Sequence, residues 1–325
     1  MTARLPWIEK YRPKNFNGMV GHEEKIVTLR NLINRNELPH LLFYGPPGTG
    51  KTSLILATAK EMYGPDYKMY ILELNASDDR GINVVRDKIP NFVKTKSDKL
   101  RLVILDEADA MTQEAQGALR RVMEQYIKTS RFCLICNNFN KIIDGVKSRC
   151  SIMRFGSLDQ TEVYTKIRTI ADNEEVYIED GAIHTLIDIE KDLRQTLNTL
   201  QGIHNKHLGS SEDGKTYKVI TSADIYDDLG KPPPEECKKI VDEMFNGNFQ
   251  EIYDKLLNIF KDNRWNSLDL IVHLGKEVIS RDLRKEEKFY LLQKLSKIEY
   301  RIVAGRDSEI QLAALVAAFQ NAKNK

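Results

Sequence analysis

Residues 45–52 read Gly-Pro-Pro-Gly-Thr-Gly-Lys-Thr, a complete phosphate-binding loop of the form G-x-x-x-x-G-K-[ST]. An apolar run at 40–44 precedes this loop and predicts a buried strand, and a helical pattern at 52–63 follows it. The order of strand, loop and helix limits the choice of folds, because it places a phosphate site where a strand runs directly into a helix. The feature therefore predicts an α/β fold.

The residue types in this loop suit the binding of a nucleoside triphosphate. Gly45, Gly48 and Gly50 allow the backbone to curl, so that successive N–H groups converge on phosphate oxygens at a helix N-terminus. Lys51 is expected to reach the outer phosphates, and the Thr52 hydroxyl is expected to hold Mg²⁺. We therefore predict that the chain binds ATP with Mg²⁺.

The composition is typical of a globular protein. The 325 residues are 41% hydrophobic and 30% charged, and this length allows two or three domains. No apolar run approaches the ~20 residues of a membrane span, and the first residues lack the apolar centre of a secretory signal. We expect a cytosolic or nuclear protein. The net charge is only +2, so a nucleic-acid surface would depend on the local placement of Lys and Arg.

Two of the four cysteines, Cys133 and Cys136, form a C-x-x-C pattern that is compatible with zinc or redox chemistry. They belong to an apolar, strand-like run, in which positions three apart point to opposite faces. A second pair of ligands is also missing from the sequence. We interpret these cysteines as reduced core thiols.

Strand-like and helical patterns alternate between residues 40 and 155, which predicts a mostly parallel sheet with helices on both faces. A nucleotide is then expected at the carboxyl ends of the strands. The expected strands are 40–44, 70–74, 101–105, 131–136 and 151–155, and the expected helices are 52–63, 82–89 and 113–127.

After residue 155 the pattern becomes helical. Helical stretches at 158–173 and 180–202, an exposed loop at 208–216, a proline-rich linker at 231–234 and a helical bundle at 235–325 are expected. The predicted domains are an ATP-binding domain at 1–157, a helical lid at 158–230 and a helical collar that assembles subunits at 231–325.

An apolar strand at 102–105 runs into Asp106 and Glu107. Asp106 is expected to hold the Mg²⁺ shell, and Glu107 is expected to polarise the water that attacks the γ-phosphorus. The alternative is a solvated turn after a strand. Residues 106–109 also spell Asp-Glu-Ala-Asp, the signature of one helicase class, but that class needs a second motor domain and the sequence offers no second βαβ series.

Taken together, these motifs resemble the AAA+ ATPases and, within them, the small subunits of the replication factor C clamp loader. The resemblance covers the whole chain. It rests on Pro-Trp-Ile-Glu-Lys-Tyr-Arg-Pro at 6–13, Leu-Asn-Ala-Ser-Asp-Asp-Arg-Gly at 74–81, Leu-Asp-Glu-Ala-Asp at 105–109, Ala-Leu-Arg-Arg at 118–121 and Ser-Arg-Cys at 148–150.

The resemblance implies roles for individual residues. Asn137 would be the first sensor of the γ-phosphate, Arg194 the second, and Arg149 an arginine finger that reaches the nucleotide of a neighbouring subunit. Arg80, Arg86 and Lys141 would follow the DNA backbone. The residues implied to surround the nucleotide are Ile8, Arg12 and Val20 near the adenine and Gly45, Pro46, Pro47, Gly48, Thr49, Gly50, Lys51, Thr52 and Ser53 at the phosphates.

The resemblance also implies an activity and partners. The chain would be an ATPase subunit of a pentamer that includes a large subunit, opens a ring-shaped sliding clamp and loads it onto primer–template DNA in replication. The implied location is the nucleus in a eukaryote and the cytoplasm or nucleoid otherwise.

Two departures from the family pattern concern local geometry. The second-sensor motif of the family begins with Gly-Asp, whereas here it begins with Lys191 and Asp192. Pro90 follows the expected helix 82–89 and is expected to end or kink it, without affecting Arg86.

Three alternatives remain at this point. A branch-migration helicase would carry a DNA-binding winged helix at its C-terminus, whereas residues 235–325 show only helical spacing. A structural subunit would bind ATP without hydrolysing it, but such subunits usually lose a loop or carboxylate residue that this chain retains. The same subunit could also serve a checkpoint complex.

Overall fold

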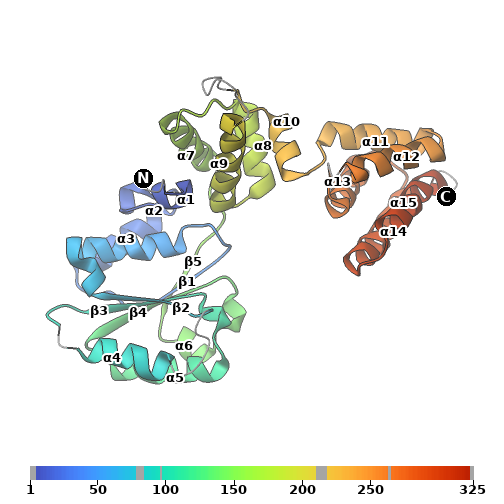
Figure 1. The fold of residues 1–325 in the computed structure, drawn as a ribbon. Helices are drawn as coiled ribbons and strands as arrows, with labels where there is room; N and C mark the ends of the chain where they lie inside the picture. The colour runs from blue at the N-terminus through green and yellow to red at the C-terminus, as the bar shows by residue number, and fades with distance from the viewer. Residues whose placement is uncertain (1–4, 78–83, 96, 210–217, 263–264, 323–325) are drawn as a thin grey trace. The chain divides into compact units, whose positions relative to one another are not determined.

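The computed structural model describes residues 5–77, 84–95, 97–209, 218–262 and 265–322 (Figure 1). The chain divides into two compact units, one formed by Met1–Val176 with Leu186–Gly202 and the other by Tyr177–Thr185 with Ile203–Lys325. Within the described ranges, no helix is long and apolar enough to cross a membrane.

Five parallel strands form the sheet of the first unit, in the spatial order β2-β3-β4-β1-β5. The strands are β1 (Leu41–Tyr44), β2 (Ile71–Asn75), β3 (Arg101–Asp106), β4 (Ser130–Cys136) and β5 (Ser151–Arg154). The predicted parallel sheet is confirmed. Strand β1 lies between β4 and β5, and its residues Leu41, Leu42 and Phe43 are fully buried.

Helices cover both faces of this sheet (Figure 1). Leu41 and Phe43 share a buried cluster with Leu54, while Leu42, on the opposite face, clusters with Leu119 and Val146. The alternation follows from the period of two in a strand, so one strand supplies two cores. The helices that contribute to these clusters are α2 (Glu23–Asn34) and α3 (Lys51–Tyr63) on the first face, and α4 (Ile89–Lys94), α5 (Gln113–Gln125) and α6 (Asp144–Lys147) on the second.

The C-x-x-C pair follows the same alternation. Cys133 belongs to the cluster of the first face and Cys136 to that of the second, so the two thiols point apart, as predicted. All four cysteines are free, and burial raises the pKa of Cys136 to about 12. Among the described residues, no group of His, Cys, Asp and Glu is arranged to hold a metal ion.

The helical segment does not end at Pro90, which contradicts the first of the two predicted outcomes, an end or a kink. A π-helical turn at Val84–Lys88 leads directly into α4, and Pro90 lies in the first turn of α4. Proline is tolerated at that position because the first N–H groups of a helix have no intrahelical acceptor. Residues 82 and 83 of the predicted helix lie outside the described ranges, and Arg86 is exposed on the π-helical turn.

The helical stretch expected at 180–202 is two helices, α8 (Asp180–Glu190) and α9 (Leu193–Gly209), which follow α7 (Gln160–Asn173). The break falls at Lys191, whose backbone adopts the left-handed conformation with φ 53°. Asp192 then caps α9, because its Oδ1 accepts a hydrogen bond from the Arg194 N–H at 2.8 Å. The loop expected at 208–216 lies mostly outside the described residues.

The second unit contains α10 (Ser222–Leu229) and a bundle of helices with its own apolar core. The bundle helices are α11 (Pro234–Asn246), α12 (Phe249–Lys261), α13 (Ser267–Ser280), α14 (Lys285–Val303) and α15 (Ser308–Ala322). The linker was predicted at 231–234, but Pro234 already occupies the first turn of α11. Residues 234–262 and 265–322 contain no strand, so the described bundle holds no winged helix.

Candidate nucleotide-binding site

The loop between β1 and α3 requires glycine for steric reasons. Gly48 and Gly50 have φ values of 69° and 88°, in the region that only glycine adopts readily. At Gly45, an added Cβ would lie 2.1 Å from the carbonyl oxygen of Phe155. The backbone therefore curls as the motif predicts, and α3 begins at Lys51 with its first N–H groups directed at the loop.

Lys51 is 7% exposed, and the loop surrounds its side chain. Its Nζ donates hydrogen bonds to the carbonyl oxygens of Gly45 at 2.9 Å and Pro46 at 2.6 Å. Burial lowers the pKa of Lys51, and the nearby carboxylate of Asp106 opposes this shift. These neutral carbonyls hold the ammonium group at the loop, where a phosphate would be a stronger acceptor.

A hydroxyl and a carboxylate meet beside the loop. The Thr52 hydroxyl donates to Asp106 Oδ2 at 2.7 Å, and the Glu107 N–H donates to Asp106 Oδ1 at 2.8 Å. Glu107 itself has φ 52°, a conformation that is strained for a non-glycine residue and is common at functional sites. Hydroxyl and carboxylate oxygens are the ligands that Mg²⁺ prefers, so this pair fits the ion.

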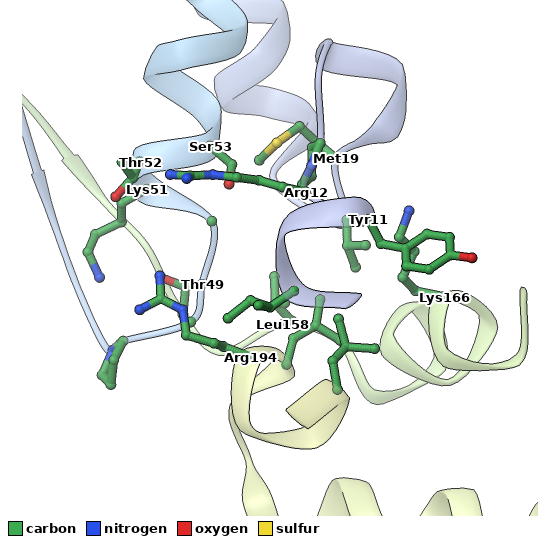
Figure 2. Close-up of a pocket in the computed structure, with 18 of the residues that line it drawn as sticks. Tyr11, Arg12, Met19, Thr49, Lys51, Thr52, Ser53, Leu158, Lys166 and Arg194 are labelled. Atoms are coloured by element: carbon green, nitrogen blue, oxygen red, sulfur yellow. The ribbon is translucent and has the colours of Figure 1, made fainter. Parts of the chain in front are cut away.

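A cavity of about 380 Å³ lies over the loop within the first unit, which is a usual size for a small-molecule site. The predicted residues that line it are Ile8, Arg12, Val20, Pro47, Gly48, Thr49, Gly50, Lys51, Thr52, Ser53, Asp106, Glu107, Asn137 and Arg194. Gly45 and Pro46 do not line the cavity but supply the carbonyls that hold Lys51. In Figure 2, Lys51 and Thr52 lie toward one end of the cavity, and Tyr11 and Lys166 lie toward the other.

Several lining residues were not predicted from the sequence. They are Glu9, Tyr11, Pro13, Met19, Leu158, Lys166, Leu193 and Leu197. Glu9, Tyr11 and Pro13 lie within the motif at 6–13, which could have indicated them. Leu158 and Lys166, in contrast, belong to the segment around α7 and carry no local signal of their own.

The N-terminal segment is bound to helices on the other side of the cavity. It contains the short helix α1 (Trp7–Lys10). The Tyr11 hydroxyl and Lys10 Nζ both donate to Glu174 Oε1, each at 2.5 Å, and the Trp7 N–H donates to Gln201 Oε1 at 3.0 Å. Burial, together with the Glu174 carboxylate, raises the pKa of Tyr11.

Asp192 and Arg194 bring α9 to the phosphate loop. An added Cβ at Gly48 would lie 1.7 Å from Asp192 Oδ1, so the carboxylate is in close contact with the loop. Arg194 is exposed and lines the cavity, and Figure 2 shows its side chain directed from α9 toward the loop. The substitution of Lys191 for the family glycine therefore leaves Arg194 at the cavity.

Asn137 follows β4 and lies at the cavity, whereas Arg86 and Lys141, two of the predicted DNA contacts, do not line it. Lys141 is exposed at the end of the 3-10 turn Phe139–Lys141. Gln116 anchors this segment, because its Nε2 donates to the Lys141 carbonyl at 3.0 Å and its Oε1 accepts from the Ile143 N–H at 2.9 Å. Arg80 lies outside the described residues.

Arg149 does not line the cavity. It follows α6, and its Nη1 donates to the carbonyl oxygen of Gly145 at 2.8 Å. Its Nη2 forms an ion pair with Glu124 of α5. The cavity of this chain is thus built without Arg149.

Comparison with protein families agrees with this geometry. Residues 41–158 match the model of the ATPase family associated with various cellular activities (AAA), and residues 232–318 match the replication factor C C-terminal domain. The parallel sheet, the phosphate loop and the two carboxylates at the carboxyl end of β3 define a nucleotide-binding AAA ATPase.

Curated relatives extend the match over nearly the whole chain. A probable replication factor C subunit 5 of Dictyostelium discoideum is 41% identical over 97% of this chain and 90% of the relative. The replication factor C subunit 5 of Homo sapiens is 39% identical over 97% and 92%, and a replication factor C small subunit of Methanococcus vannielii is 38% identical over 96% and 97%. The chain belongs to the replication factor C small-subunit family.

Solved structures show a similar fold at much lower sequence identity. The RuvB Holliday junction branch migration motor of Thermotoga maritima matches with a TM-score of 0.54 and 18% identity, over 76% of this chain and 85% of the motor. This likeness concerns the fold alone.

Proposed function

We propose that the chain is one subunit of a clamp loader, a multi-subunit ATPase that opens a ring-shaped sliding clamp and places it on primer–template DNA during replication. Relatives named as replication factor C subunits match it over almost their full length, which supports this assignment. The proposed location is the nucleus in a eukaryotic cell and the cytoplasm or nucleoid otherwise.

The chain is proposed to hydrolyse ATP and not only to bind it. The observation that carries this proposal is the convergence of Lys51, Thr52, Asp106 and Glu107 on one cavity. A purely structural subunit has no need to keep a carboxylate beside the metal-binding pair in a strained backbone conformation.

Each of these residues has a proposed task. Lys51 binds the outer phosphates, and Thr52 and Asp106 hold Mg²⁺. Glu107 accepts a hydrogen bond from the attacking water and so polarises it. Mg²⁺, when bound, offsets the negative charge of the phosphates. Asn137 and Arg194 are proposed to contact the γ-phosphate from the end of β4 and the start of α9.

Arg149 is proposed to act on the nucleotide of a neighbouring subunit. Its position outside the cavity of its own chain supports this role, because an arginine finger in trans must be presented outward. Arg80, Arg86 and Lys141 are proposed to bind DNA phosphates, and the exposure of Arg86 and Lys141 supports that proposal.

Two substitutions test hydrolysis in the assembled complex. Glu107→Gln is expected to preserve ATP affinity and to slow turnover by ~10²–10⁴-fold, because only the group that polarises water is lost. Lys51→Ala is expected to weaken ATP binding itself. The measurements are the ATP dissociation constant, single-turnover hydrolysis, and loading of a labelled clamp onto primer–template DNA.

Two results of these measurements would contradict the proposed ATPase roles. Equal losses of ATP affinity in the two variants would contradict the separate roles of Lys51 and Glu107. Full clamp loading by a complex with Glu107→Gln in this subunit would assign the chain to the class of structural subunits that do not need to hydrolyse ATP.

A further inference from the structure

The guanidinium group of Arg149 is held by contacts from two different helices. Its Nη1 donates hydrogen bonds to the Gly145 carbonyl of α6 at 2.8 Å and to Ser148 Oγ at 3.4 Å. Glu124, near the end of α5, forms an ion pair with Nη2. The first two acceptors are sequence neighbours of Arg149, but Glu124 is not.

Glu124 lies on a helix, α5, whose apolar residues are packed in the core. Helix α5 buries Leu119, Val122 and Met123 in the same core that takes up Val146 of α6, so the two helices have a fixed separation. Arg120 lies one turn before Glu124 and approaches its Oε1 at 3.9 Å. Arg120 also lies across α6, since an added Cβ at Gly145 would be 3.0 Å from its Cδ.

We propose that Glu124 is a positioning residue for Arg149, which orients the guanidinium group for the nucleotide of the neighbouring subunit. This inference rests on the proposed role of Arg149 in trans. A long, flexible arginine loses conformational entropy when it becomes ordered at a phosphate. A carboxylate that already restricts the side chain within its own subunit removes part of that cost before the subunits act together.

The contacts leave the arginine able to act. A guanidinium has more N–H donors than these three contacts use, and its planar shape fixes the direction of the remaining donors once two edges are held. The side chain of Arg149 remains 36% exposed. Glu124 therefore orients the group without enclosing it.

The simpler alternative is a surface ion pair with little effect on any function. Arg168 and Asp172 of α7 provide an exposed arginine–carboxylate pair for comparison, one helical turn apart, with 3.7 Å between Nε and Oδ1. Asp172→Asn removes a carboxylate from an arginine in the same way as Glu124→Gln, but away from Arg149. It serves as the control.

The experiment uses the assembled clamp loader, with hydrolysis abolished at every site except the one next to Arg149. In this complex Glu124→Gln is expected to lower kcat at the neighbouring site by about 10- to 100-fold, which is the effect of a small misplacement of a catalytic group, with KM for ATP unchanged. Glu124→Asp, which keeps the charge, is expected to retain more activity than Glu124→Gln. Asp172→Asn is expected to have no effect.

The double variant Glu124→Gln/Arg149→Ala separates positioning from a general structural effect. If Glu124 acts through Arg149, the double variant is as slow as Arg149→Ala alone. An additional loss in the double variant, or normal or faster turnover with Glu124→Gln alone, overturns the proposal for Glu124 and leaves the role of Arg149 intact. Normal turnover with Arg149→Ala overturns the assignment in trans, and the proposal for Glu124 fails with it.

Discussion

Glu107 at the nucleotide site and Lys191 just before α9 both adopt the left-handed backbone conformation. Glu107 has φ 52° directly after β3, and Lys191 has φ 53° at the break between α8 and α9. At Glu107 the conformation turns a carboxylate-bearing residue into the cavity, where the side chain has a proposed task. At Lys191 the side chain is exposed and does not line that cavity, so the strain there has no comparable purpose.

We predict that Lys191→Gly stabilises the first unit. The left-handed conformation costs an L-residue ~1–2 kcal/mol, which glycine avoids. The greater freedom of glycine in the unfolded chain cancels ~0.5–1 kcal/mol of this stabilisation. The expected net stabilisation is about 0.5–1 kcal/mol, measured by thermal unfolding. Lys191→Ala is the control, because it removes the charge but keeps the Cβ that causes the strain, and a similar gain in both variants would contradict this explanation.

At the scale of elements, the cavity is lined not only by the phosphate loop and the end of β3 but also by a short N-terminal segment. The segment around α1 carries Ile8 and Arg12 to the cavity, and a helix of four residues has little stability of its own. Its position depends on the hydrogen bonds to Glu174 and Gln201 and on the burial of Trp7.

We predict that Tyr11→Phe weakens ATP binding by about three- to tenfold. The substitution removes the hydrogen bond from the Tyr11 hydroxyl to the Glu174 carboxylate, and a bond to a charged group contributes ~1.5–3 kcal/mol, of which only part is transmitted to the cavity. The ATP dissociation constant measures the effect. Tyr253→Phe, a loss of a hydroxyl in the helical bundle, should leave ATP affinity unchanged. An unaltered affinity in Tyr11→Phe would show that the remaining contacts of the segment, through Lys10, Gln201 and the burial of Trp7, position it without this hydrogen bond.

At the scale of the whole molecule, the proposed DNA contacts are few and local, in agreement with a net charge of only +2. Arg86 lies on the π-helical turn before α4, and Lys141 lies on a segment that Gln116 holds against α5. A loader must act on any DNA sequence, so these groups are expected to meet phosphates and not base edges.

We predict that Arg80→Ala, Arg86→Ala and Lys141→Ala each weaken primer–template binding equally for different DNA sequences. Each variant should also reduce the slope of log affinity against log salt by roughly 0.9, the value for one lost phosphate contact. The measurement is DNA binding of the assembled complex over a salt series, with Lys261→Ala of the bundle as the control. Unchanged slopes in all three variants would mean that the DNA lies along other residues.

The sequence by itself determined the features that neighbouring residues build. The phosphate loop, the strand before it and the pair Asp106 and Glu107 at the end of β3 were predicted correctly in position, because each depends on a short segment with its own steric and hydrophobic pattern. The opposite orientation of Cys133 and Cys136 followed from the period of two in a strand.

Only the tertiary structure decided which distant segments meet. Tyr11 and Lys166 line one cavity, and Glu124 meets Arg149, although no local pattern connects the members of either pair. The break at Lys191 was likewise not predicted, because the backbone there depends on the cap that Asp192 provides. Short-range sterics are encoded residue by residue, whereas contacts between segments arise only when packed helices and strands set their distances.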